Sequence, residues 1–171
     1  MKLKILSLLA GVAFMVSCGP SYKVTTPVGI DVPSGTVTAF TTQYPAATNV
    51  VWSTYDVAAV PIDWELAGWP VLDNNDYVVR FNMDNSDYYA WYDNDGNWIG
   101  TAMLVQDYKS LPTAINTMVT TDYSGYTITS VKKEFKKDNL AYELQLSNGS
   151  SKMKLLVDQN GNIIKKKVKS E

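Results

Sequence analysis

The segment Asp93-Asn94-Asp95-Gly96-Asn97-Trp98-Ile99 decides the fold, because a near copy, Asp158-Gln159-Asn160-Gly161-Asn162-Ile163-Ile164, follows 65 residues later. Asp or Asn followed by Gly tolerates the positive φ of tight hairpin turns, so each copy predicts a turn between two strands. At the same spacing, the stretch 77–81 falls on 142–146. The sequence therefore predicts an internal duplication.

The first copy carries an insertion. Upstream of the turns, residues 40–44 fall on 119–123, a spacing of 79 rather than 65. The difference places about 14 extra residues in the first copy, within the stretch of about 60–75 that contains Trp64, Trp69 and two prolines. An insertion of this composition predicts a loop, and we treat its two tryptophans as a candidate binding loop.

Each copy is predicted to form one helix followed by four strands. Ser34 can cap a helix that reaches about residue 44 before Pro45, and Ser110 can cap a second helix, with Pro112 in its first turn, that reaches about residue 121. The stretch 140–146 alternates apolar and polar residues, as a half-buried strand does. We expect an α+β fold of two tandem helix-plus-four-strand repeats, 34–107 and 108–171, forming an antiparallel sheet with helices on one face.

The N-terminus predicts export. Lys2 and Lys4 precede an apolar stretch, 5–16, which is shorter than the roughly 20 residues that span a bilayer. Met15-Val16-Ser17-Cys18 resembles the lipobox of bacterial lipoproteins, which implies a signal peptide over 1–18 and a lipid anchor on Cys18. The alternative is an ordinary cleaved signal with an incidental cysteine. Residues 19–33 predict a flexible tether. Since no acidic run follows Cys18, we expect a periplasm-facing protein of the outer membrane.

A series of short motifs carries a resemblance to a known family. These motifs are Phe40-x-x-x-Tyr44-Pro45, Val50-Val51-Trp52, the strand from Tyr77, Ala90-Trp91-Tyr92-Asp93 and Gly96-Asn97-Trp98. Over roughly residues 36–168 the chain resembles the PepSY-like family of bacterial lipoproteins. That family is similar in fold to the β-lactamase inhibitor protein, which is built from two helix-plus-four-strand repeats. The resemblance implies this fold but no particular activity, and it carries no inhibitory residues across.

The composition argues against most enzyme chemistry. The chain has no histidine and one cysteine, which removes Ser-His-Asp and Cys-His catalysis from the mature protein. Asp93, Asp95 and Asn97 invite a calcium interpretation, but Gly96 comes too early for an EF-hand and Leu104 stands at position twelve. We therefore predict no metal and no other cofactor. A net charge of −2 without a basic excess argues against nucleic acid as a partner.

The aromatic residues suggest a binding surface instead. All five tryptophans lie in the first copy. Strand alternation places Tyr89 and Trp91 on the open face of the sheet, with Arg80 pointing outward and Trp98 beside them on the next strand. Tyr, Trp and Arg are typical of binding hot spots. The alternative is that these aromatics pack against the insertion or the tether.

Charge is distributed unevenly along the chain. Residues 19–107 contain eleven acids and two bases, whereas residues 108–171 contain six acids and eleven bases. The lysine-rich stretch 165–169 can contact anionic lipid head groups, or it can form an edge strand that its lysines protect from aggregation.

We therefore predict a non-enzymatic, lipid-anchored binding protein. Its partner would be an unidentified envelope protein, for example an enzyme that it restrains; the sequence carries no signal for an oligomeric state. The first alternative is a glycan or small-ligand binder that uses Trp91, Trp98 and Tyr89 as stacking platforms. A hydrolase that pairs aspartates among Asp84, Asp87 and the 93–95 turn is a third hypothesis, and it requires two close, buried carboxylates.

Overall fold

The computed structural model describes residues 24–25, 30–56, 69–137 and 139–170 of the chain. In these residues the elements follow the order β1 (Val24–Thr25), α1 (Ser34–Gln43), β2 (Thr48–Thr54), β3 (Tyr77–Met83), β4 (Ser86–Tyr92), β5 (Trp98–Leu104), η1 (Tyr108–Ser110), α3 (Thr113–Asp122), β6 (Thr127–Lys136), β7 (Asn139–Ser147), β8 (Ser151–Asp158) and β9 (Ile163–Ser170).

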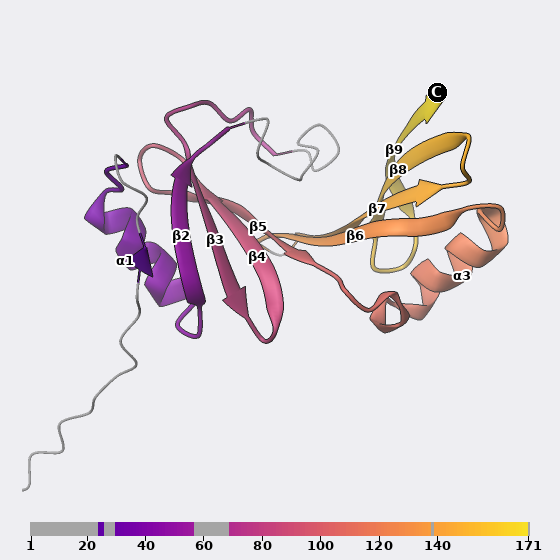
Figure 1. Ribbon diagram of the computed structural model, residues 1–171, viewed down its shortest axis with the longest axis horizontal. Helices are drawn as coiled ribbons and strands as arrows, with labels where there is room; N and C mark the ends of the chain where they lie inside the picture. Colours follow the sequence, from indigo (N-terminus) through magenta and orange to yellow (C-terminus); the bar gives the residue numbers. More distant parts are fainter. Residues whose placement is uncertain (1–23, 26–29, 57–68, 138, 171) are drawn as a thin grey trace, which may run out of the picture.

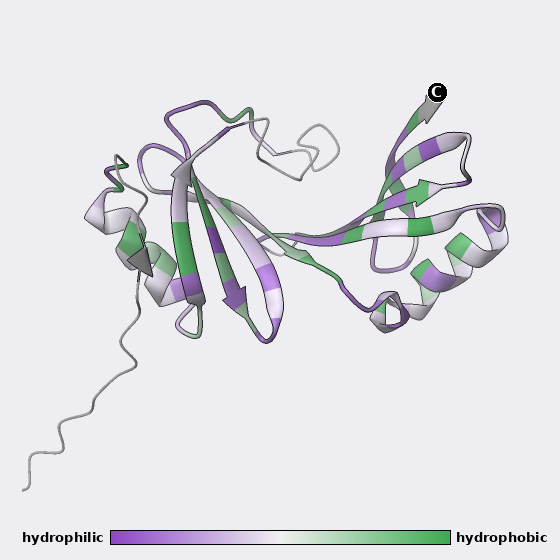
Figure 2. Ribbon diagram, viewed as in Figure 1, coloured by the Kyte–Doolittle hydropathy of each residue, from purple (hydrophilic) through white to green (hydrophobic). Residues whose placement is uncertain are grey.

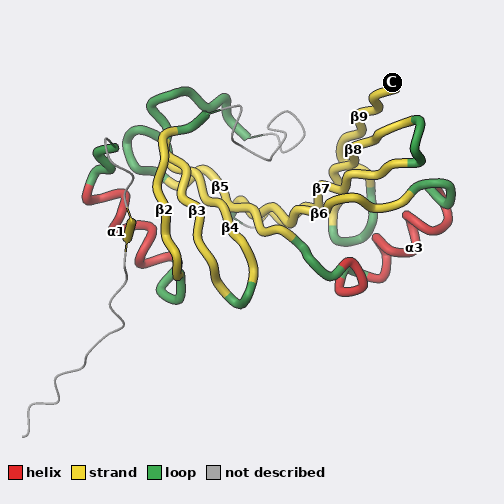
Figure 3. The backbone as a smooth tube through the Cα atoms, viewed as in Figure 1, coloured by secondary structure: helices red, strands yellow, loops and turns green. Residues whose placement is uncertain are grey.

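The described strands form one nine-stranded sheet whose spatial order follows the sequence (Figure 1). β2 to β9 pair antiparallel with their neighbours, and only β1 pairs parallel. Short turns, which suffice for antiparallel neighbours, join β3 to β4, β4 to β5, and β6 to β7, β8 and β9 in succession. Figure 3 shows the two helices at opposite ends of this sheet. The predicted α+β class with an antiparallel sheet is therefore confirmed.

Both helices lie on the same face of the sheet. Phe40 of α1 packs in one core with Trp52, Val79 and Phe81 among others, and Ile115 of α3 packs in a second core with residues of β6, β7 and β8. The two cores share a face because the register continues from Ala90 through Thr101 to Phe135. Figure 2 shows apolar and polar residues mixed along the strands. The face opposite the helices is also covered in part, by a third buried cluster that includes Tyr55, Trp69, Leu72 and Trp91.

The predicted helix caps are wrong in detail. Pro33 and Pro112 occupy the N-cap positions, and their carbonyl groups accept the first helical hydrogen bonds at 2.9–3.2 Å. Ser34 is instead the first residue of α1, and Ser110 ends η1, where its hydroxyl donates to the Asp107 carbonyl at 2.6 Å. A proline already holds the extended conformation that precedes a helix, so it serves here without a side-chain cap.

The two predicted turns are formed as expected, because Gly96 and Gly161 have φ values of 84° and 81°. Gly149, in the turn between β7 and β8, has a φ of 91°. The hairpin between β3 and β4 was not predicted from its sequence, and there Asp84 and Asn85 both adopt positive φ. Asn and Asp are the non-glycine residues that tolerate this conformation best.

Part of the predicted tether belongs to the sheet. Val24 and Thr25 form β1 against Val50 and Val51, so the prediction of an irregular segment over 19–33 is wrong at these two residues. Main-chain pairing at a sheet edge needs no side-chain periodicity, so no residue pattern over 19–33 indicates it. The predicted signal peptide, with Cys18, lies outside the described residues. No helix in the described part is long and apolar enough to cross a membrane.

Candidate binding face

The sheet face opposite α1 and α3, here called the helix-free face, contains most of the predicted site. Its first half includes Arg80, Asp87 and Tyr89. Tyr89 on β4 pairs with Ala102 on β5, and Ala102 pairs with Glu134 on β6, so these residues lie on the same face. From β6 onward the same face continues through β7, β8 and β9. The register therefore joins both halves of the chain in one surface.

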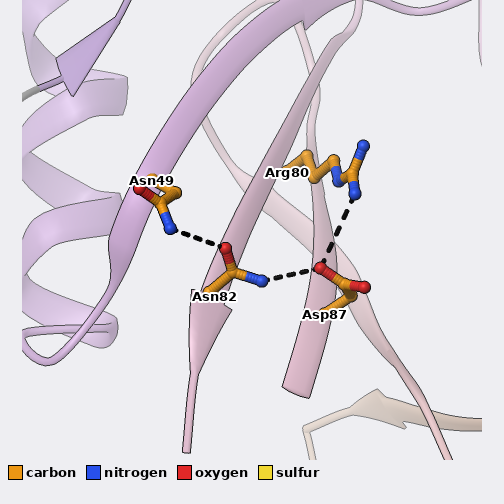
Figure 4. A network of polar contacts seen from close by, with 4 residues as sticks. All are labelled: Asn49, Arg80, Asn82 and Asp87. Carbon is orange, nitrogen blue, oxygen red and sulfur yellow. Dashed lines mark hydrogen bonds and ion pairs between the residues drawn. The ribbon is translucent and has the colours of Figure 1, made fainter. Parts of the chain in front are cut away.

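Arg80 lies in a polar network on the first half of this face (Figure 4). The guanidinium Nη2 lies 3.6 Å from Asp87 Oδ1, and Asn82 Nδ2 donates to the same oxygen at 2.6 Å. Asn49 in turn donates to Asn82 Oδ1 at 2.9 Å. The Arg80 side chain is 60% exposed, so the network orients a cation that solvent and ligands can reach.

Tyr89 lies beside this network. The Arg80 guanidinium lies 5.9 Å from the centre of the Tyr89 ring, within the range of a cation–π contact. Tyr89 is half-buried, and Val51, which pairs with Arg80 on β2, is 40% exposed. We call Val51, Arg80, Asp87 and Tyr89 the Arg80 patch. It brings together two of the four residues that the sequence predicted for the binding face.

Trp91 lies on the predicted face, but it is not exposed. Its side chain is fully buried, and its ring contacts that of Trp69, 5.1 Å away between centroids, at an interplanar angle of 62°. Gly100 pairs with Trp91 and leaves room for Trp69, since a Cβ added to Gly100 would lie 2.7 Å from the indole. The prediction of an accessible Trp91 is therefore wrong, because Trp69 covers it. Trp64, the other loop candidate, lies outside the described residues.

Trp98 lies on the opposite face from the one predicted. It packs against the core beneath α1, and its Nε1 donates to Thr101 Oγ1 at 3.0 Å. The cause is a β-bulge: Trp91 pairs with Gly100, but Tyr92 pairs with Trp98, so the alternation of β5 changes by one residue. Trp91, Trp98 and Tyr89 therefore do not form a common stacking platform.

The centre of the helix-free face holds buried charged residues. Lys132 Nζ donates to Glu143 Oε1 at 3.1 Å, and the two side chains are 5% and 0% exposed. Glu134 is also buried, at 3%. Strand alternation places all three on this face, but no sequence signal predicts their burial. The exposed part of the face is therefore divided into two areas, one on each side of this centre.

The second exposed area consists of lysines on β8 and β9. Lys154 pairs with Lys167 across the two strands, and Lys152 and Lys165 lie two residues further along on the same face. Lys154 is half-buried and the other three are exposed. We call these four residues the lysine patch. Strand alternation, which indicates the face of Tyr89, also indicates the face of these lysines.

In the two turns 93–97 and 158–162, here called the acidic turns, the first aspartate accepts hydrogen bonds from the backbone of its own turn. Asp93 Oδ1 accepts hydrogen bonds from the backbone N–H groups of Asp95 and Asn97 at 3.0 and 2.7 Å. Asp158 Oδ1 accepts equivalent bonds from Asn160 and Asn162 at 2.8 and 2.9 Å. The Asn162 amide and backbone N–H groups hold the pKa of Asp158 below its ordinary value.

These carboxylates act as acceptors within their turns, and no group of three metal-ligating side chains occurs among the described residues. Titratable groups with raised pKa values lie on the other face of the sheet. Burial raises the pKa of the Tyr44 hydroxyl and that of the Tyr92 hydroxyl beneath α1. Both are core tyrosines, and Tyr44 shares a hydrogen bond with Thr101.

The fold and its helix-free face define an α+β protein with a helix-backed antiparallel sheet and an exposed polar surface. The chain belongs to the family described as "Putative beta-lactamase-inhibitor-like, PepSY-like", whose model matches residues 75–165. This confirms the resemblance found in the sequence.

Solved structures share the fold. A BLIP-like protein from Bacteroides fragilis is 20% identical, with a TM-score of 0.65 over 84% of this chain and 91% of that one. A DUF2874 family protein from Bacteroides uniformis is 22% identical, with a TM-score of 0.62 over 81% and 90%. A third, from Bacteroides eggerthii and described as "putative periplasmic", is 18% identical, with a TM-score of 0.62 over 81% and 90%. No curated protein matches the chain.

Proposed function

We propose that this chain is a lipid-anchored binding protein of the cell envelope that docks onto another envelope protein through its helix-free face and restrains or modulates it. The Arg80 patch is the observation that carries this proposal. An exposed arginine, held by a carboxylate at 3.6 Å and lying over a tyrosine ring, is a preorganised example of the residue types that dominate protein interfaces.

Two further observations support this proposal. The chain has no histidine, and the aspartates of its two turns are engaged in hydrogen bonds with their own backbone, which leaves little for acid–base catalysis. A structural neighbour is described as BLIP-like and another as "putative periplasmic", which is consistent with an inhibitor-like role outside the cytoplasm. The lipobox around Cys18 supports the membrane anchor, and the lack of an acidic run after Cys18 supports an outer-membrane, periplasm-facing location.

A pull-down from detergent-solubilised envelope tests the proposal. The full-length tagged chain is compared with Arg80→Glu and Tyr89→Ala, and with Lys109→Glu as the control. Lys109 is an exposed base on η1, so its variant makes the same change of charge away from the helix-free face.

We expect one envelope protein to be retained by the native chain and by Lys109→Glu, and lost with both patch variants. The purified protein should then bind the native chain directly. Retention by all four baits, or by none, contradicts the proposal, provided that circular dichroism shows each variant folded.

We also propose that the two halves of the domain arose by duplication. α1 and α3 begin 79 residues apart, and β5 and β9 begin 65 residues apart. In each half the glycine of the acidic turn lies against the first turn of the helix: Gly96 against Thr36, and Gly161 against Ala114. If the halves are copies, exchanging the segments 93–99 and 158–164 should yield a folded chain; a chain that fails to fold would count against equivalence.

A further inference from the structure

A pocket of about 390 Å³ lies where four segments of the first half converge. These segments are residues 30–31 before α1, the end of β2, residues 74–77 at the start of β3, and the first acidic turn after β4. We call it the amide pocket, after the side chains of Asn74, Asn75 and Asn94 that line it. Its volume falls at the lower end of the range of about 300–1,000 Å³ for small-molecule sites, so it has room for one small ring.

The amide pocket lies at the end of the helix-covered face of the sheet. Thr54 and Tyr77 line it and pair with each other across β2 and β3. Tyr77 also pairs with Tyr92, which belongs to the core beneath α1. The pocket is therefore separate from the Arg80 patch, which lies on the helix-free face.

The pocket presents hydrogen-bonding groups that the protein does not use itself. The side chains of Asn74, Asn75 and Asn94 are exposed, and none of the three amides is hydrogen-bonded within the described part of the chain. The Asp31 carboxylate and the Thr54 hydroxyl also line the pocket, and neither has a hydrogen-bond or ion-pair partner among the described residues. Each amide offers a donor and an acceptor side by side, so the pocket can satisfy a ligand that needs both.

Two of the segments that carry these amides are held in place by other side chains. Asp76 Oδ2 accepts the backbone N–H of Asp73 at 2.9 Å, and Asp73 Oδ1 accepts that of Asn75 at 2.7 Å. Asp93 holds the first acidic turn, which carries Asn94, through the hydrogen bonds described above. Because the backbone beneath the amides is already fixed, binding a ligand orders fewer groups and costs less entropy.

The pocket also has a smaller apolar part. Ile30 and Tyr77 are half-buried lining residues, and the Tyr77 hydroxyl donates to the Asp31 carbonyl at 3.3 Å. This bond connects β3 to the segment before α1 and fixes the tyrosine. A ligand in the pocket therefore meets apolar surface beside a group of polar side chains.

The side chains that line the pocket limit the class of ligand. The lining contains no base, and its one acid is Asp31, so an anionic ligand would find no counter-charge. A calcium ion takes six to eight oxygen ligands, commonly from several carboxylates, and the pocket offers one carboxylate. Most of the lining is polar, which gives a protein side chain little apolar surface for anchoring. A neutral ring with several hydroxyl groups and an apolar C–H face matches what remains.

We propose that the amide pocket binds a neutral saccharide, one sugar unit of a glycan chain. The amides of Asn74, Asn75 and Asn94 hydrogen-bond its hydroxyl groups, and the side chains of Ile30 and Tyr77 contact its C–H face. The exposed position of the amides leaves space for the sugars on either side of the bound unit. This site goes beyond the proposed function, because it lies on the other face and takes a different class of ligand.

Saturation-transfer difference NMR with four trisaccharides tests the inference, one trisaccharide each of glucose, galactose, mannose and N-acetylglucosamine. The full-length chain, in a detergent without a sugar head group, is compared with Asn74→Ala/Asn94→Ala and with Asn139→Ala/Gln159→Ala. The control pair removes two exposed amides from a different concavity in the second half of the chain. Gln159 holds the position in the second acidic turn that Asn94 holds in the first.

We expect at least one trisaccharide to bind the native chain, and to bind the Asn74→Ala/Asn94→Ala variant about tenfold more weakly because two hydrogen bonds are lost. The control pair and Arg80→Glu should bind within about twofold of the native chain. In the native chain, the side-chain amide resonances of Asn74, Asn75 and Asn94 should shift as the trisaccharide is added, a measurement that needs no variant.

Three results would overturn the inference. The first is that none of the four trisaccharides binds the native chain. The second is that a trisaccharide binds but leaves the three amide resonances unmoved, or binds a folded Asn74→Ala/Asn94→Ala variant equally well. The third is that binding is lost in EDTA, which would assign the pocket to a divalent cation.

Discussion

The buried ion pair at the centre of the helix-free face gives the most quantitative prediction. Lys132 and Glu143 meet at 3.1 Å with side chains 5% and 0% exposed. Replacing Lys132 with Met keeps the aliphatic volume but removes the cation beside a fully buried carboxylate. Breaking a buried pair in this way costs about 3–5 kcal/mol. For a domain of this size we expect the melting temperature to fall by roughly 10 °C.

The double variant Lys132→Met/Glu143→Met separates the pair from simple loss of packing. Apolar replacement of both partners removes the buried charge with its counterion, so its stability should lie within about 1 kcal/mol of the native chain. Lys133→Met is the matched control. Lys133 is the next residue along β6 and lies half-buried on the other face, so its replacement should lower the stability by less than about 1 kcal/mol.

Urea unfolding followed by circular dichroism measures all four proteins. A single variant that costs less than about 1 kcal/mol would show that Lys132 does not hold Glu143 in a buried environment. A double variant as unstable as the single one would show that the charge of Glu143 is not what makes the loss of Lys132 costly. Either result would refute the reasoning.

Three further predictions concern other parts of the chain. Gly100→Ala should destabilise the domain by about 1–3 kcal/mol in the same urea assay, because the added methyl group would overlap Trp69. Gly125→Ala is the control: no atom lies within 4 Å of its added Cβ, so it should change stability by less than about 1 kcal/mol. The carboxyl group of Asp158 should titrate below its ordinary pKa of 3.8 in a ¹³C NMR titration. Its contribution to stability is therefore present above pH 3.8 and is lost as the pH falls through the lower pKa of the folded state. A titration midpoint at or above 3.8 would contradict the turn geometry. Cys18→Ala should abolish incorporation of labelled palmitate and release the chain from the membrane fraction, and continued labelling would exclude the proposed anchor.

Much of the fold could be predicted because its signals are local. The alternation over 140–146 gives a strand, and Asp or Asn before Gly gives a turn, since each depends on neighbouring residues only. β5 and β9 begin 65 residues apart, the same spacing as the two turns. The caps differ from the prediction because prolines occupy both N-cap positions: Ser34 follows Pro33 by one residue, and Ser110 precedes Pro112 by two.

The candidate site was harder to predict because it depends on register and coverage. Alternation placed Tyr89 and Arg80 correctly, but the bulge opposite Tyr92 moved Trp98 to the other face. No local sequence pattern predicts such a bulge. Burial of Trp91 depends on Trp69, which is distant in sequence, and Gly100 is the only local sign that a large ring needs room there.

The central claim, that the helix-free face docks a partner protein, is tested most directly by site-specific photocrosslinking in cells that produce the chain. A photoreactive benzoylphenylalanine is placed at Tyr89 on the helix-free face and, in a matched strain, at Thr120 on the exposed surface of α3. The account predicts a discrete crosslinked protein from position 89 and none from position 120. Crosslinks from position 120 alone, or the same products from both positions, would contradict it.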